Sequence, residues 1–410
     1  MPTLDVALDG AAMVEVVNRS LFAGDDACVR SCTPYYVKYK PGKYCIVQYD
    51  LKMSPEMPAR RPAYAALFPA ARLKRLRLRA GAAPYSPELG GIVQLYPADL
   101  RLPGLAEASS PERMSRRFRY LSAVTGPEVN VRSVDLVRYK AHKRAVLRYG
   151  LEGGPRRAVY GKIRKDGADL VSLYRALRNS GVPAPEPLAH LSELGMTVHA
   201  EETGTRLKDL RGELDYHGWM KPVARTLARL HETTVGTLHT RYSAAQADEL
   251  TAAARLAGRL LPALASEAGD LADRIGRALR DVDGDPSPVH GSFHDDQVLV
   301  GTDGVVMVDL DSAALGNPLE DVGHFASYLD AGGSHDAANS FLEAYGRARG
   351  LTNDVYLFEA ASLLRWATMP FRELRPDWPE AVAGRVHQAI DCFGQFRPAY
   401  RPVATKEGLT

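Results

Sequence analysis

The sequence predicts an α+β fold in which two β-rich lobes precede a larger, α-rich lobe. Two observations carry this prediction: a pair of similar hairpin segments lies in the first 151 residues, and helical periodicity dominates after residue 215. The chain has 410 residues, of which 45% are hydrophobic and 25% charged. This is an ordinary globular composition, and the length suggests about two or three domains.

The two β-rich lobes follow from an internal repeat. Residues 37–51 and 137–151 carry identical residues at six positions that lie 100 residues apart, Tyr39 and Tyr139 among them. Each segment has two runs rich in β-branched and aromatic residues, joined by a tight turn, which is typical of a β-hairpin.

The similarity continues beyond each hairpin. Residues 63–67 resemble residues 159–163, and Ala66 in the first copy corresponds to Lys162 in the second. We therefore expect a whole β-rich lobe to be duplicated. The first copy lacks the lysine, so we expect it to be a cap rather than a functional lobe.

Helical patterns dominate the rest of the chain. Met220, Val223, Leu227 and Leu230 recur at the spacing that places apolar side chains on one helix face. Earlier in the chain, two strands are predicted within 188–200. Further helices are predicted at 167–180, within 247–281, and at 336–349 and 354–369.

One short β segment interrupts these helices. A polar loop at 290–297 precedes two apolar runs around a glycine turn, which predicts a hairpin. Asp309 and Asp311 stand at the end of the second run, and strand alternation would place them on one face. With Gln297 they form an all-oxygen set of the kind that suits Mg²⁺.

The motifs of this segment resemble the aminoglycoside phosphotransferase family. The loop reads His-Gly-x-x-His-x-x-Gln from His290 to Gln297, the second run ends in Val-Asp-Leu-Asp at 308–311, and Gly-x-Pro-x-x-Asp-Val follows at 316–322. This order and spacing is specific.

The resemblance implies a bilobal protein-kinase-like fold. It would place a β-rich N-lobe at 126–205 and an α-rich C-lobe, with the catalytic hairpin, at 206–410. Residues 1–125 would form an extra N-terminal cap that looks like a duplicated N-lobe, and this portion more weakly resembles the cap of maltokinases and related sugar kinases.

The resemblance also implies roles for individual residues. Lys162 would pair with the α- and β-phosphates of ATP, while Gln297 and Asp309 would hold Mg²⁺. Asp311 would add a further contact at the metal. In the loop, His294 would approach the γ-phosphate, His290 would shape the loop and Asp321 would hold it. The adenine hinge would run near 199–203, which includes Glu201 and Glu202.

The main departure from the family pattern is Ser292, which stands where the family has its general base, an aspartate. A serine hydroxyl does not accept a proton at neutral pH as a carboxylate does. Three explanations stay open: Asp295 or Asp296 supplies the carboxylate, positioning and metal charge suffice, or the protein is a pseudokinase.

Two other departures concern the nucleotide. The helix after Lys162 offers no glutamate as a partner, since Asp169, near its start, is the only acidic residue in 167–185. The turn expected to cover the phosphates contains no glycine, so Lys140, Lys143 and Arg144 would cover them by charge instead.

Charge is unevenly distributed along the chain. Residues 1–125 hold 18 basic and 11 acidic residues, whereas the remainder holds 34 and 38. The densest basic run, at 72–79, lacks interleaved aromatic residues, which does not favour a nucleic-acid partner. The basic cap leaves a protein or peptide partner open.

The sequence also bears on the compartment. No apolar run approaches the roughly 20 residues of a membrane span, and the first residues do not form a signal peptide. Four cysteines (Cys28, Cys32, Cys45 and Cys392) do not suggest a disulfide framework. We expect a cytoplasmic protein.

The resulting functional prediction is an enzyme that phosphorylates a hydroxyl of a small molecule with ATP and Mg²⁺. The acceptor would be an aminoglycoside, a sugar, an amino alcohol or a biosynthetic intermediate. The alternatives are a nucleotide-binding pseudokinase that binds a partner, and a kinase directed at a peptide.

Overall fold

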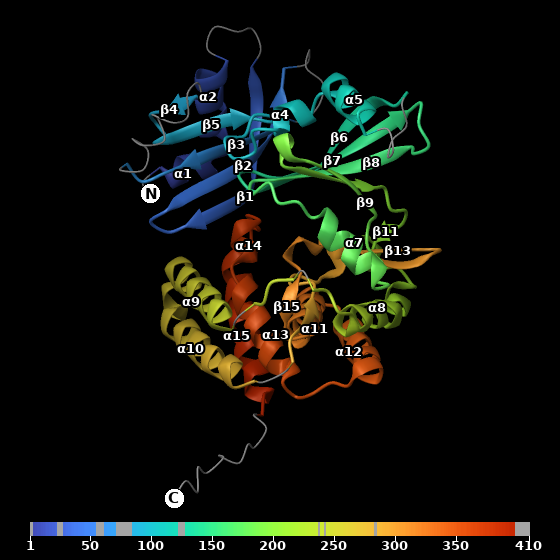
Figure 1. The fold of residues 1–410 in the computed structure, drawn as a ribbon. Coiled ribbons are helices and arrows are strands. Elements are labelled where there is room, and N and C mark those ends of the chain that lie inside the picture. Colours follow the sequence, from blue (N-terminus) through green and yellow to red (C-terminus); the bar gives the residue numbers. More distant parts are fainter. Residues whose placement is uncertain are drawn as a thin grey trace, which may run out of the picture. The chain divides into compact units, whose positions relative to one another are not determined.

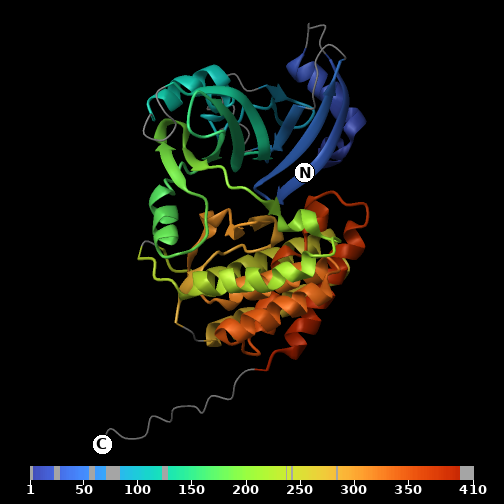
Figure 2. The same ribbon diagram turned by 90° about the vertical axis from the view of Figure 1, so that its right-hand side faces the viewer.

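We describe the chain from a computed structural model (Figures 1 and 2). The structure describes residues 3–22, 28–54, 61–70, 84–121, 128–236, 238–241, 243–282 and 285–397. The basic run at 72–79 lies outside these residues. The chain forms two compact units: an N-terminal unit of Met1–Asn179, Ala184–Thr203 and Met369–Trp378, and a C-terminal unit of Ser180–Pro183, Gly204–Thr368 and Pro379–Thr410.

The N-terminal unit contains two five-stranded sheets with the same topology. The first has the order β1-β2-β3-β5-β4, with bounds Val29–Lys40, Tyr44–Met53, Arg61–Leu67, Gly91–Leu95 and Tyr85–Ser86. The second has the order β6-β7-β8-β10-β9, with bounds Asn130–Lys140, Arg144–Glu152, Ala158–Arg164, Met196–Ala200 and Pro187–Leu191.

Strand register confirms the repeat that the sequence predicts. Lys40 pairs with Tyr44 in the first hairpin, and Lys140 pairs with Arg144 in the second. In the third strands, Ala66 lies opposite Ile46 and Lys162 lies opposite Val146, and the partners Ile46 and Val146 are again 100 residues apart. Ala66 and Lys162 therefore occupy equivalent positions in the two sheets.

One apolar core joins both sheets of this unit. It includes Ile46, Tyr64, Ala66 and Ile92 from the first sheet and Tyr139, Ala145, Leu147 and Ile163 from the second. Figure 1 shows α1 and α2 beside the first sheet and α5 beside the second. The helices of the unit are α1 (Leu4–Leu8), α2 (Gly10–Leu21), α4 (Leu105–Ala108), α5 (Pro111–Arg119), α7 (Val171–Asn179) and α14 (Met369–Arg372), with a 3-10 turn at Ser192–Leu194.

The C-terminal unit is mostly helical, and Figure 2 shows its long helices packed side by side. They are α8 (Met220–Glu232), α9 (Ser243–Leu260), α10 (Ala265–Asp281), α11 (Leu319–Ala331), α12 (His335–Arg349), α13 (Val355–Trp366) and α15 (Trp378–Gln395). Short 3-10 helices lie at Leu207–Leu210, Tyr216–Trp219, Pro262–Leu264, Asp295–Gln297 and Leu310–Ser312. The apolar residues predicted to share one face of α8 are all buried, which confirms that helix and its orientation.

The predicted catalytic hairpin is present in this unit. Its strands are β13 (Val298–Gly301) and β14 (Gly304–Met307), and β11 (Thr205–Arg206) pairs with β13; β12 (Ser287–Val289) pairs separately with β15 (Ala314–Gly316). The expectation that strand alternation aligns Asp309 and Asp311 is wrong. The strand ends at Met307, Asp309 adopts a left-handed conformation with φ of 64°, and Asp311 lies in a 3-10 turn.

No helix in the described part of the chain combines the length and apolarity needed to cross a bilayer.

Candidate active site

The loop at 290–297 is anchored by a buried carboxylate from α11. Asp321, only 1% exposed, accepts hydrogen bonds from the backbone amides of His290 (2.5 Å) and Gly291 (2.9 Å). The His290 ring reaches the other way, with its Nε2 2.9 Å from the carbonyl oxygen of Val308. The loop is therefore tied both to a helix and to the end of β14, as the sequence predicts for Asp321.

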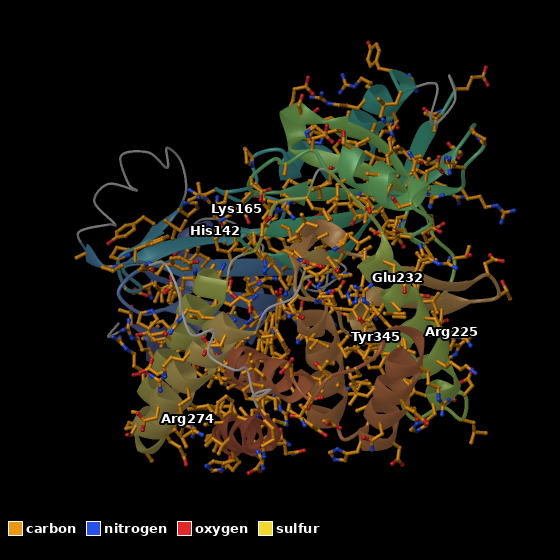
Figure 3. The ribbon with its side chains drawn as sticks, turned by 60° about the horizontal axis from the view of Figure 1, so that its bottom comes forward. His142, Lys165, Arg225, Glu232, Arg274 and Tyr345 are labelled. Atoms are coloured by element: carbon orange, nitrogen blue, oxygen red, sulfur yellow. The ribbon has the colours of Figure 1, made fainter. Side chains whose placement is uncertain are left out.

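A histidine and a tyrosine support this carboxylate. His231 on α8 lies with its Nε2 3.3 Å from Asp321 and its Nδ1 2.8 Å from the hydroxyl of Tyr345, which Figure 3 labels on α12. Burial lowers the pKa of His231, so the ring is neutral. Burial alone would raise the pKa of Asp321, but its hydrogen bonds from His231 and the His290 amide, together with the nearby histidines, outweigh burial and lower this pKa. Asp321 therefore stays ionised and holds the loop amides.

Gly291 is required by the path of this loop. Its φ is +78°, a conformation that glycine adopts without strain. A Cβ at this position would lie 2.5 Å from the carbonyl oxygen of Ser312. The loop thus passes so close to the segment after Asp311 that only glycine fits.

The metal-binding candidates lie in the segments that flank the hairpin, with Gln297 before β13 and Asp309 and Asp311 after β14. The backbone amide of Val308 donates to the carbonyl oxygen of Gln297 at 2.9 Å, which brings Gln297 beside the segment that begins with Asp309. The Gln297 side chain is 4% exposed, and its Nε2 lies 3.1 Å from Nε2 of His294. That contact holds the Gln297 amide against the His294 ring.

The oxygen donors of these three side chains are of the chemical kind that Mg²⁺ takes. Asp309 and Asp311 are partly buried. Across the residues that the structure describes, no group of three or more His, Cys, Asp or Glu side chains could hold a metal ion. Two carboxylates and an amide would leave the remaining positions to phosphate oxygens and water, as Mg²⁺ prefers.

His294 is positioned by stacking. Its ring lies 4.9 Å from the ring of Tyr328 at an interplanar angle of 21°, and its Nδ1 accepts from the backbone amide of Asp296 at 3.3 Å. The same Tyr328 ring faces the guanidinium of Arg211 at 5.3 Å. One aromatic side chain on α11 therefore orders both the histidine and a neighbouring arginine.

The two aspartates proposed as substitute bases are buried and paired with arginines. Asp295 is fully buried and accepts from Arg211 Nε at 2.6 Å; burial raises the pKa of its carboxyl, while Arg211 opposes that rise. Asp296 is 9% exposed and accepts from Arg206 at 3.2 Å. Ser292, at the position of the family's base, is partly buried.

The residues expected to contact ATP phosphates lie in the N-terminal unit. Lys162 is 8% exposed on β8, between β7 and β10. Lys140 and Lys143 flank the β6–β7 turn: Lys143 is exposed, while the Nζ of Lys140 lies 5.9 Å from the ring centroid of Tyr36.

The expected hinge residues are engaged in ion pairs. Glu201 accepts from Arg148 Nε at 2.7 Å. Glu202 accepts from the backbone amide of Glu186 at 3.3 Å, and burial raises its pKa. Both carboxylates therefore tie the segment after β10 to neighbouring parts of the second sheet.

Several site residues carry no signal in the sequence. They are the arginines that pair with the loop aspartates, the ring that stacks on His294 and the polar residues of the first repeat that contact the β6–β7 turn: Arg206, Arg211, Tyr328, Gln48, Tyr64 and Asp99. Each lies far from its partner in the chain, so no local motif marks it.

With this geometry established, comparison with known proteins places the chain. Residues 142–358 match the phosphotransferase enzyme family, APH. The chain belongs to this family. Its fold is protein-kinase-like: the structure is similar to aminoglycoside phosphotransferase APH(4)-Ia at a TM-score of 0.51 and 13% identity, covering 68% of this chain and 98% of that one.

Two further solved structures are similar at a lower score. A choline/ethanolamine kinase family protein from Mesorhizobium loti has a TM-score of 0.48 and 14% identity, covering 68% of this chain and 94% of that one. Choline kinase LicA from Streptococcus pneumoniae has a TM-score of 0.48 and 13% identity, covering 69% and 99%. Among curated proteins, none matches the chain in sequence.

Proposed function

We propose that this phosphotransferase moves the γ-phosphoryl group of ATP to a hydroxyl of a small molecule, with Mg²⁺ as cofactor. The observation that carries the proposal is the loop at 290–297, held by Asp321 beside an oxygen donor set. Family membership supports phosphoryl transfer, and the donor set supports a magnesium nucleotide as the source. The acceptor classes are those of the sequence prediction: an aminoglycoside, a sugar, an amino alcohol or a biosynthetic intermediate.

The proposed reaction is an in-line displacement. The acceptor oxygen forms a bond to the γ-phosphorus, the bond from that phosphorus to the bridging oxygen of ADP breaks, and the hydroxyl proton leaves. Gln297, Asp309 and Asp311 would hold Mg²⁺, which when bound neutralises charge on the phosphate oxygens. Lys162 would orient the phosphates, and His294 would lie near the transferred group.

For the proton, we favour Asp296 over Asp295. Asp295 is fully buried and pairs with Arg211 at 2.6 Å, and among the described residues no second carboxylate forms an ion pair with Arg211, which suits a structural role. Arg206, the partner of Asp296, also pairs with Asp209 at 2.8 Å. Asp296 therefore shares the Arg206 guanidinium with a second carboxylate, and its own ion pair can break while Arg206 stays paired. Because phosphoryl transfer has a loose transition state, the acceptor hydroxyl does not require a strong general base.

The test of the metal site is Asp309→Ala. We expect it to weaken binding of AMP-PNP with Mg²⁺ at least about tenfold, because the carboxylate charge on the cation is lost. The matched control is Asp303→Ala, an exposed aspartate in the β13–β14 turn. Calorimetric titration of the three proteins decides: equal affinities for Asp309→Ala and the unmodified chain would refute the assignment.

Ser292 favours one second candidate, a protein that binds nucleotide without transferring phosphate. An acceptor panel of aminoglycosides, sugars and amino alcohols separates the two. Turnover of ATP with any acceptor supports the kinase. Intact binding of AMP-PNP with no turnover, unchanged by Ser292→Asp, supports the non-catalytic protein.

A further inference from the structure

The β6–β7 turn of the second repeat is held by side chains of the first repeat. This turn, residues 140–143, is the one expected to cover the ATP phosphates. Within the N-terminal unit, three polar residues approach it from one side, and we call them the turn clamp. The turn clamp consists of Gln48 on β2, Tyr64 on β3 and Asp99 after β5.

Gln48 binds the backbone at the start of the turn. Its Oε1 accepts from the amide of Ala141 at 3.3 Å, and its Nε2 donates to the carbonyl oxygen of Tyr139 at 3.3 Å. The side chain is only 1% exposed, so these bonds form away from water. A buried amide used in this way satisfies backbone groups that the hairpin itself leaves unpaired.

Asp99 binds the next residue of the turn. One carboxylate oxygen accepts from the backbone amide of His142 at 2.9 Å and from the hydroxyl of Tyr139 at 2.8 Å, while the other accepts from the amide of Arg101 at 2.7 Å. Asp99 is 7% exposed. Its charge-assisted bonds are stronger than those between neutral groups.

Tyr64 completes the clamp through the His142 side chain. Its hydroxyl lies 3.0 Å from Nε2 of His142, and the two rings meet edge to face at 4.8 Å. The hydroxyl donates to Gln94 and accepts from the amide of Leu100, so toward His142 it accepts a hydrogen bond from Nε2–H of a neutral imidazole. Burial lowers the pKa of His142 to about 4, which keeps the ring neutral.

The clamp explains how the turn dispenses with glycine. His142 has a φ of +60°, a left-handed conformation that costs a side-chain-bearing residue energy. The equivalent position of the first hairpin is Gly42, with a φ of +70°. Figure 3 shows His142 near Lys165, whose backbone amide donates to the carbonyl oxygen of Lys143. The hydrogen bonds to the first repeat hold His142 in its left-handed conformation. Gly42 adopts the same conformation without such bonds because glycine has no side chain.

We propose that Gln48, Tyr64 and Asp99 are positioning residues that hold the β6–β7 turn in its nucleotide-binding conformation. The first repeat then acts in place of a glycine-rich loop: it fixes the backbone of a turn that would otherwise leave its left-handed conformation. The inference rests on the proposed function, because it takes the turn to cover a nucleotide.

The first test is hydrogen exchange in the full chain. Asp99 accepts three hydrogen bonds through two carboxylate oxygens, and Asp99→Asn removes the charge and replaces one of these oxygens with an NH2 group that cannot accept. We expect exchange at the His142 amide to accelerate at least about tenfold, while the Lys143 amide, bonded within the hairpin to Lys140, changes little. Unchanged exchange at His142 would overturn the clamp, whether or not a nucleotide binds.

The second test is AMP-PNP affinity with Mg²⁺. Asp99→Asn should weaken binding about tenfold, because the competent turn becomes a minor conformation. Adding His142→Gly to Asp99→Asn should restore most of the affinity, since glycine adopts the left-handed conformation alone. The matched control is Tyr49→Phe. It removes a buried 2.7 Å hydrogen bond from Tyr49 on β2 to the carbonyl oxygen of Ala7 on α1, elsewhere in the first repeat.

The outcomes separate this inference from the proposed function. If the unmodified chain binds no AMP-PNP, the proposed function fails. If it binds and Asp99→Asn leaves the affinity within twofold, only the clamp's role fails. Equal losses in Asp99→Asn and Tyr49→Phe would also overturn the inference, because general destabilisation would then explain both. Selective loss with rescue by His142→Gly supports it.

Discussion

At the scale of single residues, Glu359 on α13 brings a carboxyl group into the core of the C-terminal unit. It is 4% exposed, and its Oε1 has no hydrogen-bond partner. Burial raises the pKa of Glu359 from 4.5 to about 7, and Asp330 adds to the rise. The native protein therefore keeps a proton that the unfolded chain releases between pH 4.5 and 7, so this residue lowers stability as the pH rises through that window.

We predict that Glu359→Gln stabilises the protein at alkaline pH. The neutral amide avoids ionisation in the core, so the free energy of unfolding should rise by about 3 kcal/mol at pH 8 and change little at pH 4. Urea unfolding at both pH values measures this. The control is Glu343→Gln, an exposed glutamate on α12. A gain of equal size at pH 4 would mean that packing, not ionisation, is responsible.

Single residues also show what could be predicted from the sequence and what could not. The equivalence of Ala66 and Lys162 followed from the repeat, because strand register preserves spacing. The alignment of Asp309 with Asp311 was wrong, since β14 stops at Met307 and the backbone turns into a left-handed residue. Periodicity describes a strand only as far as the strand extends.

At the scale of elements, the loop at 290–297 depends on α11 for its shape. Asp321 of α11 links the loop to two helices, since it accepts from two loop amides and lies against His231 of α8. An asparagine here would turn an N–H group toward these donors and leave buried amides unpaired.

We therefore predict that Asp321→Asn lowers the free energy of unfolding by about 3–5 kcal/mol, because it breaks a buried charged network. Chemical denaturation measures the loss. Asp336→Asn, an exposed substitution in the first turn of α12, should stay within about 0.5 kcal/mol of the unmodified protein. A similar loss in both variants would show that Asp321 does not organise the loop.

The elements were predicted far better than the contacts between them. Hairpins and helices leave periodic patterns in the sequence. The structure has the hairpin at 298–307, α8 and both repeat hairpins at the positions that those patterns predict. The pairing of Arg211 with Asp295 spans 84 residues and that of Arg206 with Asp296 spans 90. Such pairs depend on how elements pack, which one sequence does not reveal.

At the scale of the molecule, one apolar cluster of the N-terminal unit contains residues of both repeats. The predicted boundary between residues 125 and 126 would assign α5 to the cap. Yet α5 packs on the second sheet: the rings of Phe118 and Tyr149 meet at 5.2 Å, and Ser115 accepts from the backbone amide of Val131 at 2.8 Å. The second sheet thus depends on a helix that precedes that boundary.

Two truncations test this dependence. A chain that begins at residue 104 keeps α4 and α5, whereas one that begins at residue 128 loses both. Burying Phe118 alone contributes about 2–3 kcal/mol, so the shorter chain should melt at the lower temperature, bind more of a hydrophobic dye and form aggregates. Thermal denaturation followed by circular dichroism compares them. Equal melting temperatures would mean that the second sheet is stable without α5 and that the boundary after residue 125 is the physical one.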